Sequence, residues 1–323
     1  MSDAAGEGAF LAGGNREHRP EMTYGGALSF LRRRYSRDLA GVDVAVLGVP
    51  WDAAVTYRPG CRLGPRAIRA ASVQLAELKA FPFGFDLMEA LAVVDYGDCW
   101  LDPHHPGTVA PAIEAQAAAI IAGGTKLLTL GGDHFIAWPL LSAHAARHGP
   151  LALIQADAHG DLWPDDPGRI DHGTMMGRAI AEGLVDPARS TQIGIRTFHD
   201  TTEGLEVLTA PWLHRNGIAA AIDAAVARAG DAPVYLSFDI DALDPAFAPG
   251  TGTPVPGGLA SWQALELIRG LAPLNLVGMD IVEVSPPFDH AEITALAAAH
   301  LAHDWLCVLA GQAGARAVPV GRL

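Results

Sequence analysis

The chain has 323 residues, half of them hydrophobic, and its 36 acidic against 22 basic residues give a formal net charge of −14. This composition supplies enough apolar material for a large globular core, while the negative charge argues against nucleic acid or an anionic membrane as a partner, because both require a basic face. The N-terminus lacks the apolar centre of a signal peptide, no apolar run approaches the roughly 20 residues that span a bilayer, and the cysteines are few and scattered, so we expect a cytoplasmic protein without disulfides.

Short runs rich in Val, Ile and Leu alternate with Ala-rich stretches along most of the chain. In chain order, buried parallel strands are predicted at 42–49, 126–130, 151–156, 192–195, 234–238 and 274–279. Helices are predicted at 65–79, 111–121, 138–147, 218–228, 262–271 and 291–309. This alternation predicts a three-layer α/β fold, a doubly wound parallel sheet with helices on both faces. Because no linker or repeat divides the chain, we expect an N-terminal extension at 1–40 and a single domain at 41–323.

Acidic residues and histidines stand where three of the predicted strands end. They are His134 in Gly-Gly-Asp-His, then Asp157, His159 and Asp161 in Asp-Ala-His-Gly-Asp, and Asp239 and Asp241 in Asp-Ile-Asp. In an open parallel sheet, ligands bind beyond the carboxyl ends of the strands, and the period of two sends alternate side chains of an extended segment to one side. The pattern therefore predicts that two imidazoles and four carboxylates meet in one crevice.

A crevice with so many carboxylates indicates bound cations, because unneutralised carboxylates in a desolvated site repel one another strongly. Four carboxylates carry too much negative charge for one divalent ion and suit two, with some carboxylates bridging both. Oxygen ligands with a minority of imidazoles favour Mn²⁺, and Ni²⁺, Co²⁺, Fe²⁺ or Zn²⁺ are compatible because affinity alone does not select the ion.

Glu283 is a further candidate, because a carboxylate set in a Val/Ile run is costly unless something cationic meets it. His172, in Asp-His-Gly-Thr, carries no such signal by itself. We expect no chemistry from the remaining histidines, His199 among them.

These segments resemble the signature segments of the ureohydrolases, the family that contains arginases and agmatinases. The resemblance is carried by the three segments above, by residues 237–254 around Asp239 and Asp241, and by Glu283-Val-Ser-Pro, and it extends from about residue 44 to residue 307. Residues 48–52, 58–69, 192–196 and 289–296 are similar to agmatinases in particular. The resemblance implies an arginase-like fold, with 41–323 as the catalytic domain.

The resemblance also implies a binuclear metal-dependent hydrolase that cleaves a C–N bond of a small guanidine compound, giving urea or a urea derivative and an amine. By matching positions, one ion would be bound by His134, Asp157, Asp161 and Asp239, and the other by His159, Asp157, Asp239 and Asp241. Asp157 and Asp239 would then bridge the ions. A guanidinium resists water, so hydroxide made available by metal coordination suits this reaction.

Three residues are expected to be catalytic. Glu283 would pair with the guanidinium, His172 would protonate the leaving amine as general acid, and Asp161 is counted both as catalytic residue and as ligand. A deacylase or amidohydrolase on the same fold is disfavoured, because Glu283 and the two-ion ligand set suit a guanidinium rather than a neutral amide.

The loop that would border the substrate's tail departs from the family pattern. Gly160 stands where agmatinases and arginases usually carry Thr or Ser, Leu162 stands where they usually carry Thr, and Trp163 follows. We expect these three residues to contact the substrate, and their character would suit a small alkylguanidine or a biguanide. Agmatine nevertheless ranks first, because the chain resembles agmatinases over most of its length and Asp165 and Asp166 could pair with its ammonium. Arg169 could instead bind the carboxylate of guanidinobutyrate or guanidinopropionate.

The assembly is expected to be a trimer or hexamer, either of this chain alone or with a related subunit. A non-catalytic partner subunit is the alternative that is not an enzyme, and such a chain would be expected to lose metal ligands. This chain keeps every matching one.

Overall fold

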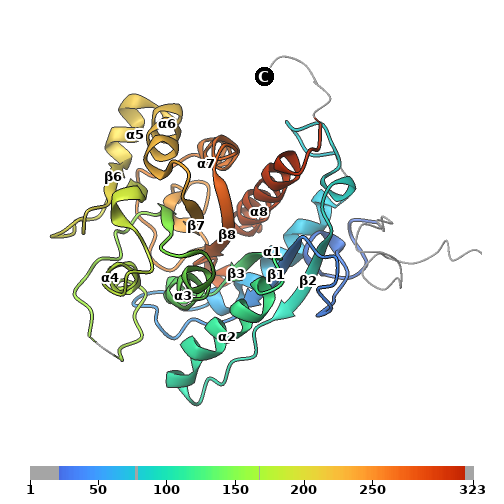
Figure 1. Ribbon diagram of the computed structural model, residues 1–323, viewed down its shortest axis with the longest axis horizontal. Helices are drawn as coiled ribbons and strands as arrows, with labels where there is room; N and C mark the ends of the chain where they lie inside the picture. The colour runs from blue at the N-terminus through green and yellow to red at the C-terminus, as the bar shows by residue number, and fades with distance from the viewer. Residues whose placement is uncertain (1–21, 77–78, 167, 317–323) are drawn as a thin grey trace, which may run out of the picture.

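The protein is described here by a computed structural model that covers residues 22–76, 79–166 and 168–316 (Figure 1). One parallel sheet has the strand order β2-β1-β3-β8-β7-β4-β5-β6. The strands are β1 Val44–Val49, β2 Val93–Asp98, β3 Lys126–Gly131, β4 Ala152–Ala156, β5 Thr191–Ile195, β6 Glu206–Thr209, β7 Pro233–Asp239 and β8 Asn275–Val282. All six predicted strands are present.

Helices cover both faces of the sheet, as an all-parallel sheet requires. They are α1 Gly64–Ser72, α2 Val109–Ile121, α3 Ala137–His148, α4 Met175–Ala181, α5 Ala210–Asn216, α6 Ile218–Ala229, α7 Ser261–Gly270 and α8 Ile293–Gln312. On one face α3 packs between α2 and α4, and on the other the neighbours run α1, α8, α7, α6, α5 (Figure 1). The predicted three-layer fold, a doubly wound parallel sheet with helices on both faces, is therefore confirmed.

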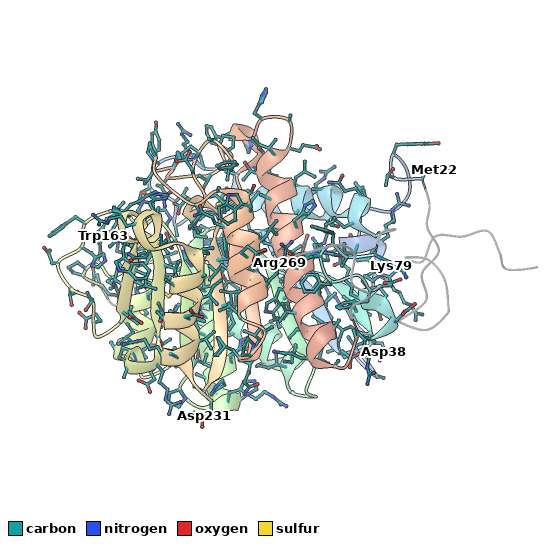
Figure 2. The ribbon with its side chains drawn as sticks, turned by 90° about the horizontal axis from the view of Figure 1, so that it is seen from above. Met22, Asp38, Lys79, Trp163, Asp231 and Arg269 are labelled. Atoms are coloured by element: carbon teal, nitrogen blue, oxygen red, sulfur yellow. The ribbon has the colours of Figure 1, made fainter. Side chains whose placement is uncertain are left out.

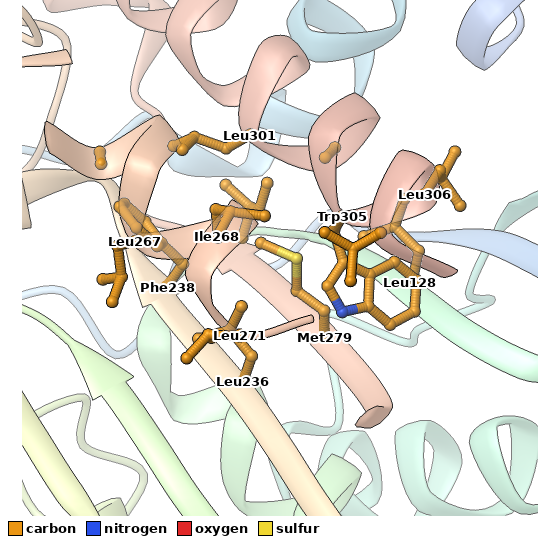
Figure 3. Close-up of a cluster of buried hydrophobic side chains, with 14 of the residues drawn as sticks. Leu128, Leu236, Phe238, Leu267, Ile268, Leu271, Met279, Leu301, Trp305 and Leu306 are labelled. Atoms are coloured by element: carbon orange, nitrogen blue, oxygen red, sulfur yellow. The ribbon is translucent and has the colours of Figure 1, made fainter. Parts of the chain in front are cut away.

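The central strands form the most buried part of the sheet. Figure 3 shows Leu128 of β3, Leu236 and Phe238 of β7 and Met279 of β8 beneath side chains of α7 and α8, with Trp305 of α8 among them. These side chains are fully buried, and truncating one such leucine to alanine typically costs about 2–5 kcal/mol. This packing fixes the strand ends from which the site is built.

The sequence did not indicate the two outer strands or two of the shorter helices. Strands β2 and β6 lie at the two edges of the sheet and contain charged residues, and β6 has only four residues. Helices α4 and α5 have seven residues each. The helix predicted at 65–79 is also shorter than expected, since α1 ends at Ser72 and a 3₁₀ turn, Val73–Leu75, follows.

The expected N-terminal extension lies partly outside the described residues, which begin at Met22. Within its described part, Phe30 and Leu31 are buried in the core on the α1 side, and Tyr35 pairs with Asp95 of β2. This segment therefore packs against the edge of the sheet.

Helix α8 is, among the described residues, the one helix long and apolar enough to cross a membrane. However, 78% of its apolar window is buried inside the protein, where it packs between α1 and α7. Its apolar character is explained by its place in the core.

Candidate metal centre

Four neighbouring strands in the middle of the sheet, in the order β3-β8-β7-β4, carry the candidate site at their carboxyl ends. The residues concerned are His134 after β3, Glu283 after β8, Asp239 and Asp241 at the end of β7, and Asp157, His159 and Asp161 after β4. Parallel strands present their carboxyl ends at the same edge, which is where ligands bind in such sheets. The structure therefore brings all the sequence-predicted ligands into one crevice.

His134 lies among three buried carboxylates. Its Nδ1 is 3.1 Å from Oδ2 of Asp157, 3.1 Å from Oδ2 of Asp161 and 3.3 Å from Oδ2 of Asp239. Despite these short distances, this Nδ1 makes no hydrogen bond within the described residues. A buried nitrogen that faces three carboxylate oxygens without bonding to any of them fits a position where a cation is shared by all four groups.

The other side of the His134 ring supports the same conclusion. Its Nε2 is 2.8 Å from Oγ of Ser237, and the Ser237 hydroxyl donates to Oδ1 of Asp280 at 2.8 Å. Because the hydroxyl has only one proton, Ser237 must accept from Nε2–H of His134. With the proton on Nε2, the neutral form of the ring has its lone pair on Nδ1, toward the carboxylates, as a metal-binding histidine requires.

A second group of ligand atoms adjoins the first. Nδ1 of His159 is 3.1 Å from Oδ2 of Asp241 and 3.5 Å from Oδ1 of Asp157. Asp157 therefore presents one oxygen to His134 and the other to His159. The ligand atoms of His134, Asp157 and Asp239 lie within 4.8 Å of one another, as do those of Asp157, His159 and Asp241. The arrangement offers two adjacent cation sites that share a carboxylate.

The side chains converge through turns, and the expected extended segments with a period of two are not what brings them together. Strand β4 ends one residue before Asp157, and Asp161 has a left-handed backbone with φ of +52°. Oδ1 of Asp157 accepts from the backbone N–H of His159 at 2.7 Å, and Oδ1 of Asp239 accepts from that of Asp241 at 2.8 Å. Aspartate often bonds the backbone two residues ahead in this way. The geometric reason for the prediction was wrong, although the residues do meet.

The buried carboxylates of the crevice raise the pKa values of neighbouring groups, so that these groups hold protons. Burial and the charge of Asp157 raise the pKa of Asp161 to about 7, and burial with the charges of Asp241 and Asp157 raises the pKa of Asp239 well above its ordinary value. Burial alone would lower the pKa of His159, but the charge of Asp241 and the contacts with Asp157 and Asp241 outweigh it and raise the pKa to about 12. Divalent cations would meet this demand in place of protons.

Glu283 is buried beside the ligand group, and its backbone has a left-handed φ of +63°. Its Oε1 accepts from the backbone N–H of His134 at 2.9 Å and lies 3.0 Å from Nδ1 of His172. Its Oε2 is buried and makes no hydrogen bond within the described part of the chain. Strained backbone of this kind persists where the surrounding structure holds it and often marks a functional position. One carboxylate oxygen of Glu283 is thus left for a cationic partner.

His172 lies between Glu283 and Thr56. Its Nε2 is 2.9 Å from Oγ1 of Thr56 and 3.2 Å from the Thr56 backbone nitrogen. Burial would lower the pKa of His172, but the hydrogen bond and charge of Glu283 outweigh it, so the pKa is raised to about 9. The imidazole therefore carries a proton near neutral pH and can deliver it.

A small pocket opens onto these groups. It is lined by Thr56, His159, Asp161, Trp163, His172, Gly173, Asp239 and Thr253. Candidate ligands and the candidate acid thus share one cavity.

The three residues expected to contact the substrate's tail have different surroundings. Trp163 is 49% exposed, lines the pocket and lies at the end of the molecule away from Met22 (Figure 2). Leu162 is only 6% exposed and packs in the core on the α3 and α4 side, outside the pocket lining. Gly160 lies under the His199 ring, since a Cβ built on it would be 2.4 Å from Cδ2 of His199. Only Trp163 directly presents apolar surface to the pocket.

Two charged residues considered for the tail are already paired. Arg178 donates to both oxygens of Asp165, at 2.7 and 2.6 Å. Arg169 forms an ion pair with Asp171 at 2.6 Å. Neither Asp165 as an ammonium site nor Arg169 as a carboxylate site gains support from this arrangement.

Several residues that support the site were not predicted from the sequence. Gln155 in β4 donates to Asp157 at 2.8 Å and to Asp161 at 3.2 Å. It and Asp280 are buried polar residues in otherwise apolar strands, which is the signal that pointed to Glu283. Thr56 belongs to a loop, where no periodicity distinguishes it.

One other group of potential metal ligands occurs within the described residues. His303, Asp304 and Cys307 lie on α8 with their ligand atoms within 4.8 Å of one another. Asp304 forms an ion pair with Arg269 of α7 at 2.7 Å, so its charge is already balanced. This group is part of the packing between α7 and α8.

Comparisons with known proteins point to one family. The Arginase family profile matches residues 42–307. The chain is 60% identical over 313 residues to an agmatinase of Chromobacterium violaceum, covering 96% of this chain and 97% of that protein. Among solved structures, it is similar to a hypothetical agmatinase from Burkholderia thailandensis, with a TM-score of 0.94, 55% identity and coverage of 95% and 98% of the two chains. It is also similar to proclavaminate amidino hydrolase from Streptomyces clavuligerus, with a TM-score of 0.85, 38% identity and coverage of 90% and 99%.

Proposed function

The chain belongs to the Arginase family and is a metal-dependent ureohydrolase that cleaves a guanidino C–N bond, and from this premise we propose that its substrate is agmatine. Hydrolysis would give urea and the corresponding diamine. The proposal is supported by the 60% identity to an agmatinase over nearly the whole chain. Guanidinobutyrate would need a cationic site for its carboxylate, and the candidate for that role, Arg169, is paired with Asp171.

Members of the Arginase family use a binuclear divalent metal centre, and the ligand set fits one here. We propose that His134, Asp157, Asp161 and Asp239 hold one ion and that His159, Asp157, Asp239 and Asp241 hold the other. Four carboxylates among six ligands favour Mn²⁺. The bound ions would lower the pKa of water enough to supply hydroxide near neutral pH.

The proposed orientation of the substrate rests on one observation, the carboxylate oxygen of Glu283 that has no hydrogen-bond partner in the part of the chain that the structure describes. Its Oε2 is buried without a hydrogen-bond partner in the described residues, while Oε1 is fixed by His134 and His172. A guanidinium is planar and always charged, and a carboxylate is its natural partner. Glu283 would therefore hold the guanidinium beside the metal centre, with its carbon exposed to attack.

His172 would supply the proton that the departing amine needs. Its raised pKa keeps it protonated at neutral pH, and His172 and Thr56, whose Nε2 and Oγ1 are 2.9 Å apart, both line the pocket. As the C–N bond breaks, the proton passes from the imidazole to the leaving nitrogen. Once His172 has lost this proton, Nδ1 of its neutral ring remains in contact with the Glu283 carboxylate.

The purified chain, loaded with Mn²⁺, should release urea from agmatine with a kcat/KM at least about tenfold above that for guanidinobutyrate, arginine, guanidine or a biguanide. The chain should be active without a related subunit, because it supplies every proposed ligand itself. A preference for another compound would overturn the substrate, and activity that appears only with a co-expressed relative would favour the partner-subunit alternative.

A further inference from the structure

The His199 ring occupies the space above Gly160, in the middle of the metal-ligand loop. A Cβ on Gly160 would lie 2.4 Å from Cδ2 and 2.9 Å from Nε2 of His199. Gly160 stands between His159 and Asp161, both of which line the pocket. Any larger residue at 160 would displace the imidazole, so the glycine is what allows the ring to approach the site.

The loop that carries His199 is tied to the same metal-ligand loop. The carbonyl oxygen of Ala158 accepts from the backbone N–H groups of Arg196 at 2.9 Å and Thr197 at 3.2 Å, and from the Thr197 hydroxyl at 3.0 Å. These bonds join the end of β5 to the segment after β4. The position of His199 is therefore set by the scaffold that holds the ligands.

The orientation of the ring decides what it can bind. Nδ1 of His199 is 2.6 Å from the carbonyl oxygen of Thr201. A carbonyl can only accept, so Nδ1 donates, and in this tautomer the lone pair of the ring is at Nε2. This Nε2, on the side of Gly160, has no partner within the described residues. It is suited to accept a hydrogen bond from a cation.

Trp163 lies against Gly173 in the same way that His199 lies against Gly160. A Cβ on Gly173, the residue after His172, would lie 2.6 Å from Cε3 and 2.9 Å from Cζ3 of Trp163. The indole lines the pocket, and an aromatic face attracts an ammonium within about 6 Å. Two rings thus lie against glycines of the site: Trp163 lines the pocket, and His199 lies against Gly160, between two pocket-lining residues.

We propose that His199 determines specificity for a substrate with a cationic tail, by accepting a hydrogen bond at Nε2 from the terminal ammonium. The inference rests on the proposed use of agmatine and adds how the protein distinguishes it from other guanidines. Asp165 cannot take this part, because both of its oxygens are bound by Arg178. Asp166 is exposed and is the competing candidate.

The test compares agmatine with n-pentylguanidine, which has the same length and a methyl group in place of the ammonium. His199→Phe keeps an aromatic ring over Gly160 and removes the acceptor. The kcat/KM ratio of agmatine to n-pentylguanidine should fall roughly ten- to hundredfold in this variant, as expected for loss of a hydrogen bond to a charged group. The change in His199→Phe should lie mainly in the KM for agmatine. His199→Gln should restore part of the ratio through its amide oxygen. Asp166→Asn should leave the ratio unchanged.

Metal content measured on each variant shows whether the site is intact. If wild type does not prefer agmatine over n-pentylguanidine, both the proposed substrate and the role of His199 fail. If wild type prefers agmatine and His199→Phe retains that preference, or Asp166→Asn removes it, only the role of His199 is overturned.

Discussion

Asp157 and Asp239 stand at the ends of neighbouring strands, β4 and β7, and each accepts a hydrogen bond from the backbone N–H two residues ahead, at 2.7 and 2.8 Å. These matching turns use one oxygen of each carboxylate to shape the loop. The other oxygen of each, Oδ2, faces Nδ1 of His134. Two strands thus present equivalent carboxylates to one point.

The first prediction concerns the number of ions lost with each carboxylate. Asp157→Asn and Asp239→Asn should lose both ions and reduce kcat/KM more than about 100-fold, because each is proposed to bridge. Asp161→Asn and Asp241→Asn should each lose one ion preferentially and retain more activity. Elemental analysis of the four purified variants measures this directly, and equal losses in all four would remove the bridging assignment.

A second prediction tests the support behind His134. Ser237→Ala removes the acceptor for Nε2 of His134 and also leaves Asp280 with one donor fewer. Partners of metal ligands typically affect metal affinity by 10–100-fold, so we expect a loss in this range with the fold retained. Titration with Mn²⁺, followed by activity and by calorimetry, measures the affinity. Ser142→Ala, at a partly buried position on α3 where the hydroxyl bonds Glu114 of α2, is the control and should bind Mn²⁺ as wild type does.

The third prediction separates substrate binding from metal binding. Glu283→Gln should leave both ions bound while turnover falls by about 100-fold or more, because the amide cannot pair with a guanidinium. Metal content and urea release measured on the same sample provide the comparison. Loss of metal in this variant would mean that Glu283 acts on the ions.

The fourth prediction concerns pH. The pKa of His172 is raised to about 9, so its protonated form prevails below this pH and is lost as the pH rises through it. If His172 is the general acid, kcat should decline above about pH 9. His172→Phe should lower kcat more than it changes KM, as for an interaction made in the transition state, and should remove the alkaline decline. A variant profile that keeps the same decline would assign it to another group.

The sequence allowed the central strands and the ligands to be predicted for one physical reason. Strands β3, β4, β7 and β8 are buried on both faces and therefore read as apolar runs, so a charged residue at their ends stands out. The edge strand β6 has the sequence Glu-Val-Leu-Thr and is only partly buried, which gives no such contrast. His199 gave no signal at all, because its relation to Gly160 depends on two loops that follow different strands.

The last prediction follows from the different surroundings of Gly160 and Leu162. Gly160→Thr places a side chain where the His199 ring lies, so the ring must move and the preference for agmatine over n-pentylguanidine should fall about tenfold or more. Leu162→Thr instead puts a hydroxyl and a smaller volume into a core position that is 6% exposed, which should cost roughly 2–4 kcal/mol of stability. That variant should unfold at lower denaturant concentration but keep the wild-type preference among substrates. Denaturant titration and the substrate ratio, measured on both variants, separate the two effects. If Leu162→Thr changed the preference for agmatine over n-pentylguanidine and Gly160→Thr did not, the substrate's tail would be recognised through Leu162. That result would contradict the role proposed for His199.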